Sequence, residues 1–278
     1  KADGALRRNL LSRVRMFFYA GAALAQPVWD SLYASSELEI NERIAMTTGL
    51  GMTESAPFGL FVTSTNVKAG DLGIPTPGLQ LKLVPVNGKI EVRYKGPNIS
   101  PGYWRAPDAT AEAFDEEGFF CTGDAVKWID ESNIHAGLKF DGRIAEDFKL
   151  ATGTFVSVGP LRAKIIAAGA PYVQDAVLTG INGHEVGALI FPTAAGRLLH
   201  AELAAAHFQK LVNDLALTAT GSATRIARLH VMHEPASIDK GEVTDKGSIN
   251  QSAVLRHRSV LVHALHLDEI EVIFKPCS

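Results

Sequence analysis

The stretch TGLGMTE, residues 48–54, holds residue types that nucleotide chemistry needs. Gly49 and Gly51 allow a close backbone approach, and Thr53 and Glu54 then stand side by side. A hydroxyl can contact phosphate, and a carboxylate together with substrate phosphates is a usual way to hold Mg²⁺. The alternative is structural, because Thr is favoured before a helix and Glu in its first turn. This stretch alone leaves both interpretations open.

Two further polar stretches follow it along the chain. CTGD, residues 121–124, ends on Asp124, whose carboxylate could accept both hydroxyls of a ribose. DGR, residues 141–143, ends on Arg143, whose forked guanidinium suits phosphate or ribose oxygens. Each also has a structural explanation, a β-turn for the first and a solvated linker for the second. Because all three occur in order, we predict a nucleotide site.

The periodicity of apolar residues indicates which elements position these stretches. Helical spacing predicts helices within 5–20 and 26–46. Between 70 and 141, alternating strands and the pair Asn87-Gly88, a strong type I′ hairpin signal, predict a compact β subdomain. Residues 142–278 show two short helical patterns, a hairpin, a long amphipathic helix and a strand. The sequence therefore predicts a mixed α+β chain in the α/β class, divided near the glycine of DGR.

The composition argues against a nucleic-acid-binding protein, a membrane-spanning protein and a disulfide-rich secreted protein. The chain has 278 residues, 46% hydrophobic content and a formal net charge of -3, which gives no basic stripe for nucleic acid. It has no apolar run of the roughly 20 residues that cross a bilayer. The basic and then apolar start is interrupted by polar residues and does not match a signal peptide well. Two cysteines form neither a disulfide framework nor a metal pattern, so we expect a cytoplasmic protein.

Longer blocks around these motifs resemble the adenylate-forming (AMP-binding) superfamily, which includes acyl-CoA synthetases and adenylation domains. GLGMTE is similar to its Y-G-x-T-E block and GFFCTGD to its W-(F/Y)-x-T-G-D block. KIEVRYKGPNISPGYWRAPDATAEAF resembles the block that ends in G-Y and, seven residues on, Thr. DGRIAEDFKLATGTFV resembles the hinge block, and FFYAGAALAQPVWD an earlier G-(G/A)-A-x-L block. Within the superfamily, the residues of these blocks most resemble those of feruloyl-CoA synthase-like aryl acid:CoA ligases.

The resemblance implies a fold, a reaction and a set of ligands. The fold would be a partial large adenylation domain, 1–141, that includes the β subdomain 70–141, followed by a small mobile C-terminal domain, 142–278. The reaction would use ATP and Mg²⁺ to convert a carboxylate, we expect an aromatic acid, into an acyl-adenylate. Coenzyme A would then form the thioester, with AMP as the other product.

The resemblance also assigns roles to residues at matching positions. Thr53 would contact phosphate during catalysis and Glu54 would hold Mg²⁺, while Asp124 and Arg143 would contact the ribose and phosphate. Gly153 would line the thiol side. The remaining assignments are Gly49, Leu50 and Gly51 at the nucleotide, and Tyr19, Gly21, Ala22 and Gly51 at the acyl pocket.

Three positions depart from the family pattern. Leu50 replaces an aromatic residue that stacks on adenine, and Ala145 replaces the common hinge Asp. In GEVTDKGSINQ, Ser248 stands where the family has its catalytic lysine. Lys246, two residues earlier, is our first candidate for that role and Lys240 the second, whereas both could also be solvated loop charges.

A fourth departure concerns the phosphate-binding loop, S-G-(S/T)-T-G-x-P-K-G, which no stretch of this sequence matches. We therefore expect the C-terminal portion of a synthetase, with a missing N-terminal half and little adenylation by this chain alone. The alternative is a catalytically inactive remnant that acts as a binding or oligomeric interaction module. A third hypothesis is an adenylation domain that loads a carrier protein. The nine histidines show no metal-binding pair.

Overall fold

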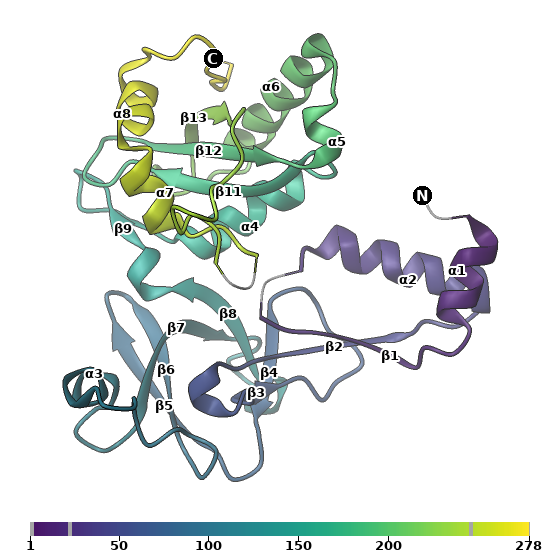
Figure 1. The fold of residues 1–278 in the computed structure, drawn as a ribbon, viewed down its shortest axis with the longest axis vertical. Coiled ribbons are helices and arrows are strands. Elements are labelled where there is room, and N and C mark those ends of the chain that lie inside the picture. Colours follow the sequence, from purple (N-terminus) through teal and green to yellow (C-terminus); the bar gives the residue numbers. More distant parts are fainter. Residues whose placement is uncertain (1–2, 22–23, 245–246, 278) are drawn as a thin grey trace. The chain divides into compact units, whose positions relative to one another are not determined.

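A computed structural model describes residues 3–21, 24–244 and 247–277. The chain forms two compact units, residues 1–144 and 145–278, and each unit has its own hydrophobic core (Figure 1). Both units combine helices with sheets, which confirms the predicted mixed α/β class. Among the described residues, no helix is long and apolar enough to cross a membrane.

The first unit is built on an eight-stranded sheet with the order β1-β2-β3-β4-β8-β7-β6-β5. The pair β1–β2 is parallel and every other neighbouring pair is antiparallel. The sheet is therefore one continuous structure that joins the β-rich region to the first two strands. The strands are β1 (Met16–Tyr19), β2 (Ala45–Leu50), β3 (Leu60–Phe61), β4 (Asp71–Pro75), β5 (Gln80–Val86), β6 (Lys89–Lys95), β7 (Phe120–Trp128) and β8 (Leu138–Arg143).

In the described part of this unit, three α-helices accompany the sheet, and two of them differ from the predicted ranges. They are α1 (Gly4–Leu11), α2 (Gln26–Ile40) and α3 (Pro107–Ala113). The expected helix within 5–20 was wrong at its second half, because MFFY pairs as β1 with a strand far along the chain. The expected helix within 26–46 ends at Ile40, because Asn41 adopts a left-handed conformation with φ 55°.

Helix α2 covers one side of the β1–β2 pair (Figure 1). Trp29 of α2 is fully buried and meets the ring of Tyr19 edge-on, with 5.4 Å between ring centres. On the alternate positions of β1, Phe18 is half exposed and stacks on Phe61 of β3. Side chains alternate between the two faces of a strand, so the helix buries only one of them.

The hairpin β5–β6 confirms the turn predicted from Asn87-Gly88. Both residues have positive φ, 51° and 80°, as a type I′ turn requires. Strand β6 then places Val92 and Tyr94 in the core of the β-rich region, where both are fully buried. This core fixes the neighbouring strands β7 and β8, which carry the second and third motifs.

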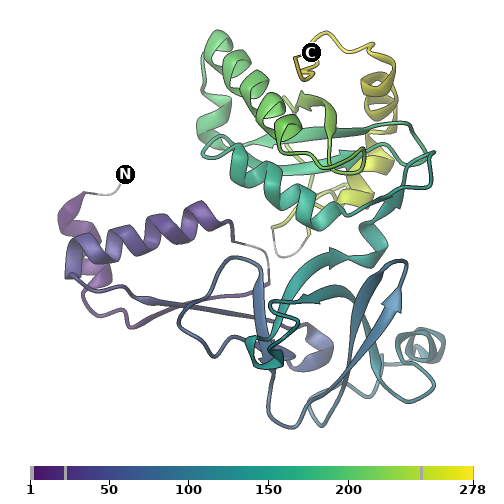
Figure 2. The same ribbon diagram turned by 180° about the vertical axis from the view of Figure 1, so that it is seen from behind.

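The second unit has a three-stranded sheet with the order β11-β12-β13, covered on both faces. Helices α4 and α6 pack on one face, as Figure 2 shows, and α7 and α8 pack on the other. A separate hairpin, β9–β10, precedes α4. The elements are β9 (Phe148–Lys149), β10 (Phe155–Val156), α4 (Val158–Ala168), β11 (Val173–Thr179), β12 (Val186–Pro192), α5 (Ala194–Arg197), α6 (Ala201–Leu217), β13 (Ile226–Val231), α7 (Gln251–His257) and α8 (Ser259–Leu267).

Candidate functional site

The Thr53–Glu54 pair lies in a short 3₁₀ turn, Thr53–Ser55, just beyond the end of β2. Ser55 is fully buried and fixes the turn, because its hydroxyl accepts from the Met52 backbone N–H at 3.0 Å and donates to the Met52 carbonyl at 3.1 Å. Thr53 is exposed and Glu54 is half-buried. The Thr53 hydroxyl and the Glu54 carboxylate therefore lie on a turn that the adjacent residue Ser55 holds in place.

The glycines before this turn are required by the chain's own backbone. A Cβ at Gly51 would lie 1.2 Å from the Pro57 carbonyl oxygen, and one at Gly49 would lie 2.3 Å from the Leu60 carbonyl oxygen. Strand β3 and the segment before it fill this space. The sequence predicted that these glycines allow a close backbone approach. In the structure, the segment that approaches them is the chain itself at Pro57 and Leu60.

Leu50, the residue between those glycines, lies opposite Leu60 in the β2–β3 pairing. It is half-buried and packs against the core of the β-rich region, together with Met52. Its position at the stacking face of a nucleotide base remains a prediction.

Glu54 is held by a residue from a distant part of the sequence. The Tyr103 hydroxyl donates a hydrogen bond to Glu54 Oε1 at 2.8 Å, and the Ser100 backbone N–H donates to the Glu54 carbonyl at 2.8 Å. Asn98 Nδ2 donates to the carbonyls of Ser55 and Phe58 at 2.9 and 2.7 Å. The hydrogen bond to Glu54 is the main cause of the raised pKa of Tyr103. The loop at 96–103 therefore closes over the Thr-Glu turn.

Asp124 and Arg143 are brought together by the pairing of β7 with β8. They are direct partners in the antiparallel register, and Arg143 Nε lies 2.8 Å from Asp124 Oδ1. The Asp124 side chain is 1% exposed and that of Arg143 is 54% exposed. A buried carboxylate beside a solvent-facing guanidinium offers both an acceptor and a donor to one polar ligand. The two motifs predicted separately thus form one unit.

The turn before Asp124 is fixed by its neighbours on β6. The Thr122 hydroxyl accepts from the Asp124 backbone N–H at 3.0 Å and donates to the Val92 carbonyl. Gly123 has φ 68° and its N–H donates to Glu91 Oε1 at 3.0 Å. A left-handed conformation favours glycine, so this position explains the Gly in CTGD.

Asp124 and Tyr94 are both buried, and the charge of Asp124 acts on Tyr94. Tyr94 is fully buried, and its hydroxyl has no hydrogen-bond partner among the described residues. Burial raises the pKa of Tyr94 far above its ordinary value, and the charge of Asp124 raises it further. Low polarity around a carboxylate strengthens its interaction with any hydrogen-bond donor.

The predicted acyl-pocket residues lie near the end of β1. Tyr19 pairs with Thr48 in the parallel β1–β2 register, so the carboxyl ends of both strands meet at one edge. Burial is the main cause of the raised pKa of Tyr19. Gly21 is exposed with φ 85°, and Ala22 lies outside the described residues. The parallel pair therefore places Tyr19 and Gly21 beside the strand that leads to Thr53 and Glu54.

In the second unit, Gly153 lies at the tip of the β9–β10 hairpin. It has φ 81°, and a Cβ there would meet nothing within 4 Å. The Ala151 N–H donates to the Gly183 carbonyl at 2.8 Å, and the Asn182 N–H donates to the Lys149 carbonyl at 2.9 Å. These bonds tie the hairpin to the turn between β11 and β12, so the base is fixed and the tip is accessible.

Ser248 and its surroundings form a tight turn. Thr244 Oγ1 and Ser248 Oγ share a hydrogen bond of 2.7 Å, and the Thr244 N–H donates to the Ser248 carbonyl at 2.8 Å. The first lysine candidate, Lys246, lies outside the described residues. The second, Lys240, is exposed on a neighbouring turn.

Two ion pairs anchor this turn on either side. Arg258 donates to Glu242 Oε1 and Oε2 at 2.9 and 2.7 Å, and the Glu242 side chain is 1% exposed. Arg162 donates to both oxygens of Asp175 at 2.6 Å, and to the Ile249 carbonyl at 3.0 Å. Such forked, charge-assisted bonds fix orientation as well as distance.

Glu54 is the motif carboxylate that was predicted to hold a metal ion. Among the described residues, no group of three or more His, Cys, Asp or Glu side chains could hold a metal ion. A single carboxylate such as that of Glu54 is compatible with a cation that is shared with nucleotide phosphates, since Mg²⁺ usually takes one or two carboxylates and keeps phosphate and water ligands.

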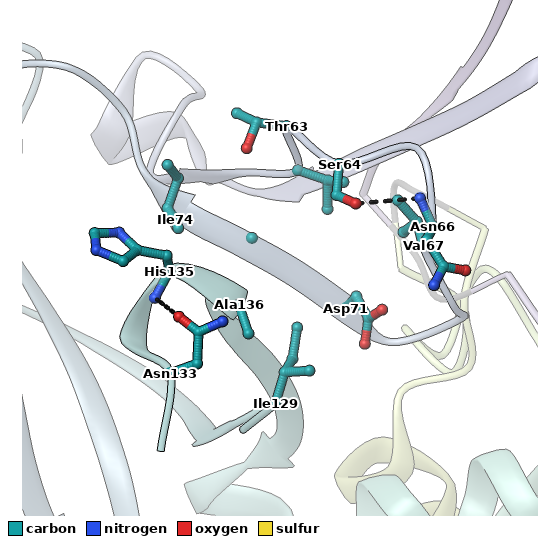
Figure 3. Close-up of a pocket in the computed structure, with 12 residues that line it drawn as sticks. Thr63, Ser64, Asn66, Val67, Asp71, Ile74, Ile129, Asn133, His135 and Ala136 are labelled. Carbon is teal, nitrogen blue, oxygen red and sulfur yellow. Dashed lines mark hydrogen bonds between the residues drawn. The ribbon is translucent and has the colours of Figure 1, made fainter. Parts of the chain in front are cut away.

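A separate cavity of about 240 Å³ lies in the first unit, behind β4 and the turn after β7 (Figure 3). Its lining includes Thr63, Asp71, Asn133 and His135. The lining contains no residue of the three motifs. This cavity is therefore separate from the three nucleotide motifs.

Sequence reasoning missed the residues that position the motifs. Tyr103, Glu242 and Arg258 act through contacts between distant segments, which no local spacing reveals. The only signal in the sequence was the presence of GYW between the first two motifs.

Comparison with known proteins finds similarity to acyl-CoA ligases over part of the chain. Residues 148–267 match the family described as AMP-binding enzyme C-terminal domain. Human long-chain-fatty-acid–CoA ligase 6 is 33% identical over 160 residues, which are 55% of this chain and 22% of that protein. Probable 4-coumarate–CoA ligase 2 of Dictyostelium discoideum is 29% identical over 185 residues, 64% of this chain and 32% of that protein. The chain thus spans less than a third of the length of these relatives.

Solved structures share the fold over almost the whole chain. The A domain of carboxylic acid reductase from Segniliparus rugosus, in complex with AMP and a co-purified carboxylic acid, matches with a TM-score of 0.70 and 21% identity. That match covers 96% of this chain and 42% of the reductase domain. The anthranilate CoA ligase AuaEII, in complex with anthranoyl-AMP, matches with a TM-score of 0.67 and 19% identity over 93% of this chain and 46% of its own. Residues 148–267 thus match the AMP-binding enzyme C-terminal domain family, and more than half of the chain is similar in sequence to acyl-CoA ligases.

Proposed function

We propose that this chain carries the AMP-binding side of an ATP-dependent acid:CoA ligase. The observation that carries the proposal is the Asp124–Arg143 pair, which joins two family motifs across β7 and β8 with the carboxylate 1% exposed. Asp124 would accept the ribose hydroxyls of the nucleotide, and Arg143 would donate to the ribose and phosphate oxygens. Since one residue is buried and the other is exposed, the nucleotide would approach from the Arg143 side.

The reaction would proceed in two steps. A carboxylate oxygen attacks the α-phosphorus of ATP, which forms the acyl-adenylate and releases pyrophosphate. The thiolate of coenzyme A then attacks the acyl carbon, which forms the thioester and releases AMP. Donors at the α-phosphate stabilise the developing charge in the first step.

Residues of this chain would divide this work. Thr53 would donate its exposed hydroxyl to phosphate, and Glu54 would hold the cation that bridges to the phosphates. Mg²⁺, when bound, supplies positive charge that neutralises the phosphate oxygens. Lys246 is our first choice for the cation at the α-phosphate, with Lys240 second. Gly153, at the hairpin tip, would border the path of the thiol.

The substrate is proposed to be an aromatic acid, of the feruloyl-CoA synthase-like type. Support comes from the blocks quoted above and from the 4-coumarate–CoA ligase among the relatives. We also propose that this portion of a ligase acts in the cytoplasm. Because no stretch of the sequence matches the phosphate-binding loop, it needs that loop from elsewhere for full adenylation.

Calorimetry with AMP tests the proposal directly. We expect the 278-residue chain to bind AMP weakly and to catalyse little ATP–pyrophosphate exchange. A chain without AMP affinity would contradict the proposed nucleotide site. Robust exchange by this chain alone would contradict the need for an external phosphate loop. Comparison of coenzyme A with a carrier protein as thiol acceptor, in the protein at its natural length, separates the ligase from a carrier-loading domain.

A further inference from the structure

The pairing of Tyr103 with Glu54 has a role that the motifs do not assign. Tyr103 lies 49 residues beyond Glu54 in the sequence, and its hydroxyl donates to Glu54 Oε1 at 2.8 Å. It is the only described residue with a hydrogen bond to that carboxylate. One oxygen of Glu54 is thereby held in place, while the other is left for a ligand.

The residues around GYW, 102–104, hold the Tyr103 hydroxyl in this position. A Cβ at Gly102 would lie 2.4 Å from Thr110 Cγ2, and Gly102 has φ 142°, so only glycine fits. Without that Cβ, Thr110 Oγ1 can accept from the Tyr103 backbone N–H at 2.9 Å. The Ser100 N–H holds the Glu54 carbonyl at 2.8 Å. The spacing from Gly102 to Thr110 is thus explained by the placement of Tyr103.

Fixing a glutamate before a cation arrives has a physical benefit. A Glu side chain loses much rotamer freedom when it is ordered, and this cost falls on metal binding if nothing else has ordered it. The Tyr103 hydrogen bond orders the side chain in advance, and it is a charge-assisted bond. Tyr103 is 40% exposed, so the phenol itself does not seal the carboxylate from solvent.

We propose that Tyr103 is the residue that positions Glu54 as a ligand for a divalent cation bound with nucleotide phosphates. This inference rests on the proposed function, because it takes Glu54 as the metal ligand. Tyr103 acts through Glu54 and does not contact the cation or the nucleotide.

The test compares nucleotide affinities with and without Mg²⁺. Wild type, Tyr103→Phe, Glu54→Gln and the control Trp104→Phe are titrated with ATP, at saturating Mg²⁺ and in its absence, and with AMP alone. Trp104 is the adjacent residue and is 88% exposed, so its replacement keeps the loop and leaves Glu54 bonded. The quantity compared is the factor by which Mg²⁺ increases ATP affinity.

We expect Tyr103→Phe to lower this factor by about tenfold, because the free energy of one charge-assisted hydrogen bond corresponds to about this change in affinity. Glu54→Gln should remove most of the factor, and Trp104→Phe should leave it at the wild-type value. AMP affinity should be the same in all four proteins, which also shows that the variants are folded.

Each other outcome overturns a defined statement. A Tyr103→Phe factor equal to wild type, with a lowered Glu54→Gln factor, overturns the role of Tyr103 and leaves the proposed function standing. A Glu54→Gln factor equal to wild type, or a wild-type factor of one, overturns Glu54 as the ligand and the inference with it. A wild-type chain that binds neither ATP nor AMP overturns the proposed function as well.

Discussion

Asp124 and Arg143 face each other across two antiparallel strands, with 2.8 Å between the carboxylate and the guanidinium. They are 19 positions apart in the sequence, and only the β7–β8 register makes them neighbours. The arrangement gives the buried carboxylate a fixed orientation and leaves the guanidinium edge in solvent. It is the relationship on which the proposed nucleotide site depends.

Replacing Asp124 with Asn should reduce AMP affinity by more than about tenfold, since a neutral amide loses charge-assisted bonds to the ribose hydroxyls. Calorimetry with AMP and 2′-deoxy-AMP measures this. Wild type should prefer AMP, whereas Asp124→Asn should bind the two alike. Asp141→Asn is the matched control, because Asp141 lies on the neighbouring strand β8 and accepts a hydrogen bond from Lys127 at 2.8 Å. Unchanged AMP binding in Asp124→Asn would refute the ribose role.

Lys246→Ala should slow acyl-adenylate formation by about 10²-fold or more. Removing one preorganised group that stabilises a developing oxyanion typically lowers the rate by this factor. Lys240→Ala should change the rate little. The measurement is ATP–pyrophosphate exchange in the protein at its natural length. The opposite ranking would identify Lys240 as the catalytic lysine.

A gain-of-function variant tests the same assignment. Ser248→Lys places a lysine at the family position, in the turn now closed by the 2.7 Å hydrogen bond between Thr244 and Ser248. In a Lys246→Ala background it should recover part of the lost exchange rate. Absence of any recovery would count against the alignment of Ser248 with that position.

Gly51→Ala should destabilise the first unit by about 3 kcal/mol, because the new Cβ would overlap the Pro57 carbonyl oxygen and the turn has to move. Gly88→Ala, at φ 80° with nothing within 4 Å of its Cβ, should cost about 1 kcal/mol from left-handed strain alone. Urea unfolding followed by tryptophan fluorescence measures both variants, since all three tryptophans lie in this unit. Equal costs would show that the turn relaxes around Gly51.

The Glu242–Arg258 pair should make the second unit sensitive to acid. The hydrogen bonds from Arg258 are the main cause of the lowered pKa of Glu242, with the Ser237 N–H contributing. A carboxyl group whose pKa is lower in the folded than in the unfolded protein stabilises the fold at pH values above its unfolded-state pKa, which is about 4.5 for Glu242. This stabilisation is lost as the pH falls through the pKa of the folded state. The unfolding free energy of the second unit should therefore decrease below about pH 4.5.

Variants isolate this contribution. Glu242→Gln should flatten the acid dependence measured by circular dichroism, whereas Glu271→Gln, at an exposed position, should keep it. Arg258→Met should destabilise the unit by about 3 kcal/mol at neutral pH, because it leaves a buried carboxylate without its partner. An acid profile that is identical in Glu242→Gln and wild type would contradict the assignment.

Local patterns predicted the elements whose signals are short-range. The Asn87-Gly88 hairpin, the strands that carry CTGD and DGR and the amphipathic helix α6 all follow from turn chemistry and periodicity. MFFY was predicted as helix and folds as β1, because the parallel partner that decides its conformation lies 29 residues away. Parallel pairing depends on tertiary context, which outweighs local spacing.

By itself, the sequence determined which residue types are available for nucleotide chemistry and the order of their motifs, since these are properties of the printed chain. Only the tertiary structure decided which of them meet. The strand register joins Asp124 to Arg143, and the closure of the 96–103 loop sets Tyr103 on Glu54. Gly49 and Gly51 are required by the carbonyls of Leu60 and Pro57, contacts that spacing cannot show. Side-chain positions depend on packing between distant segments, and that information exists only once the chain has folded.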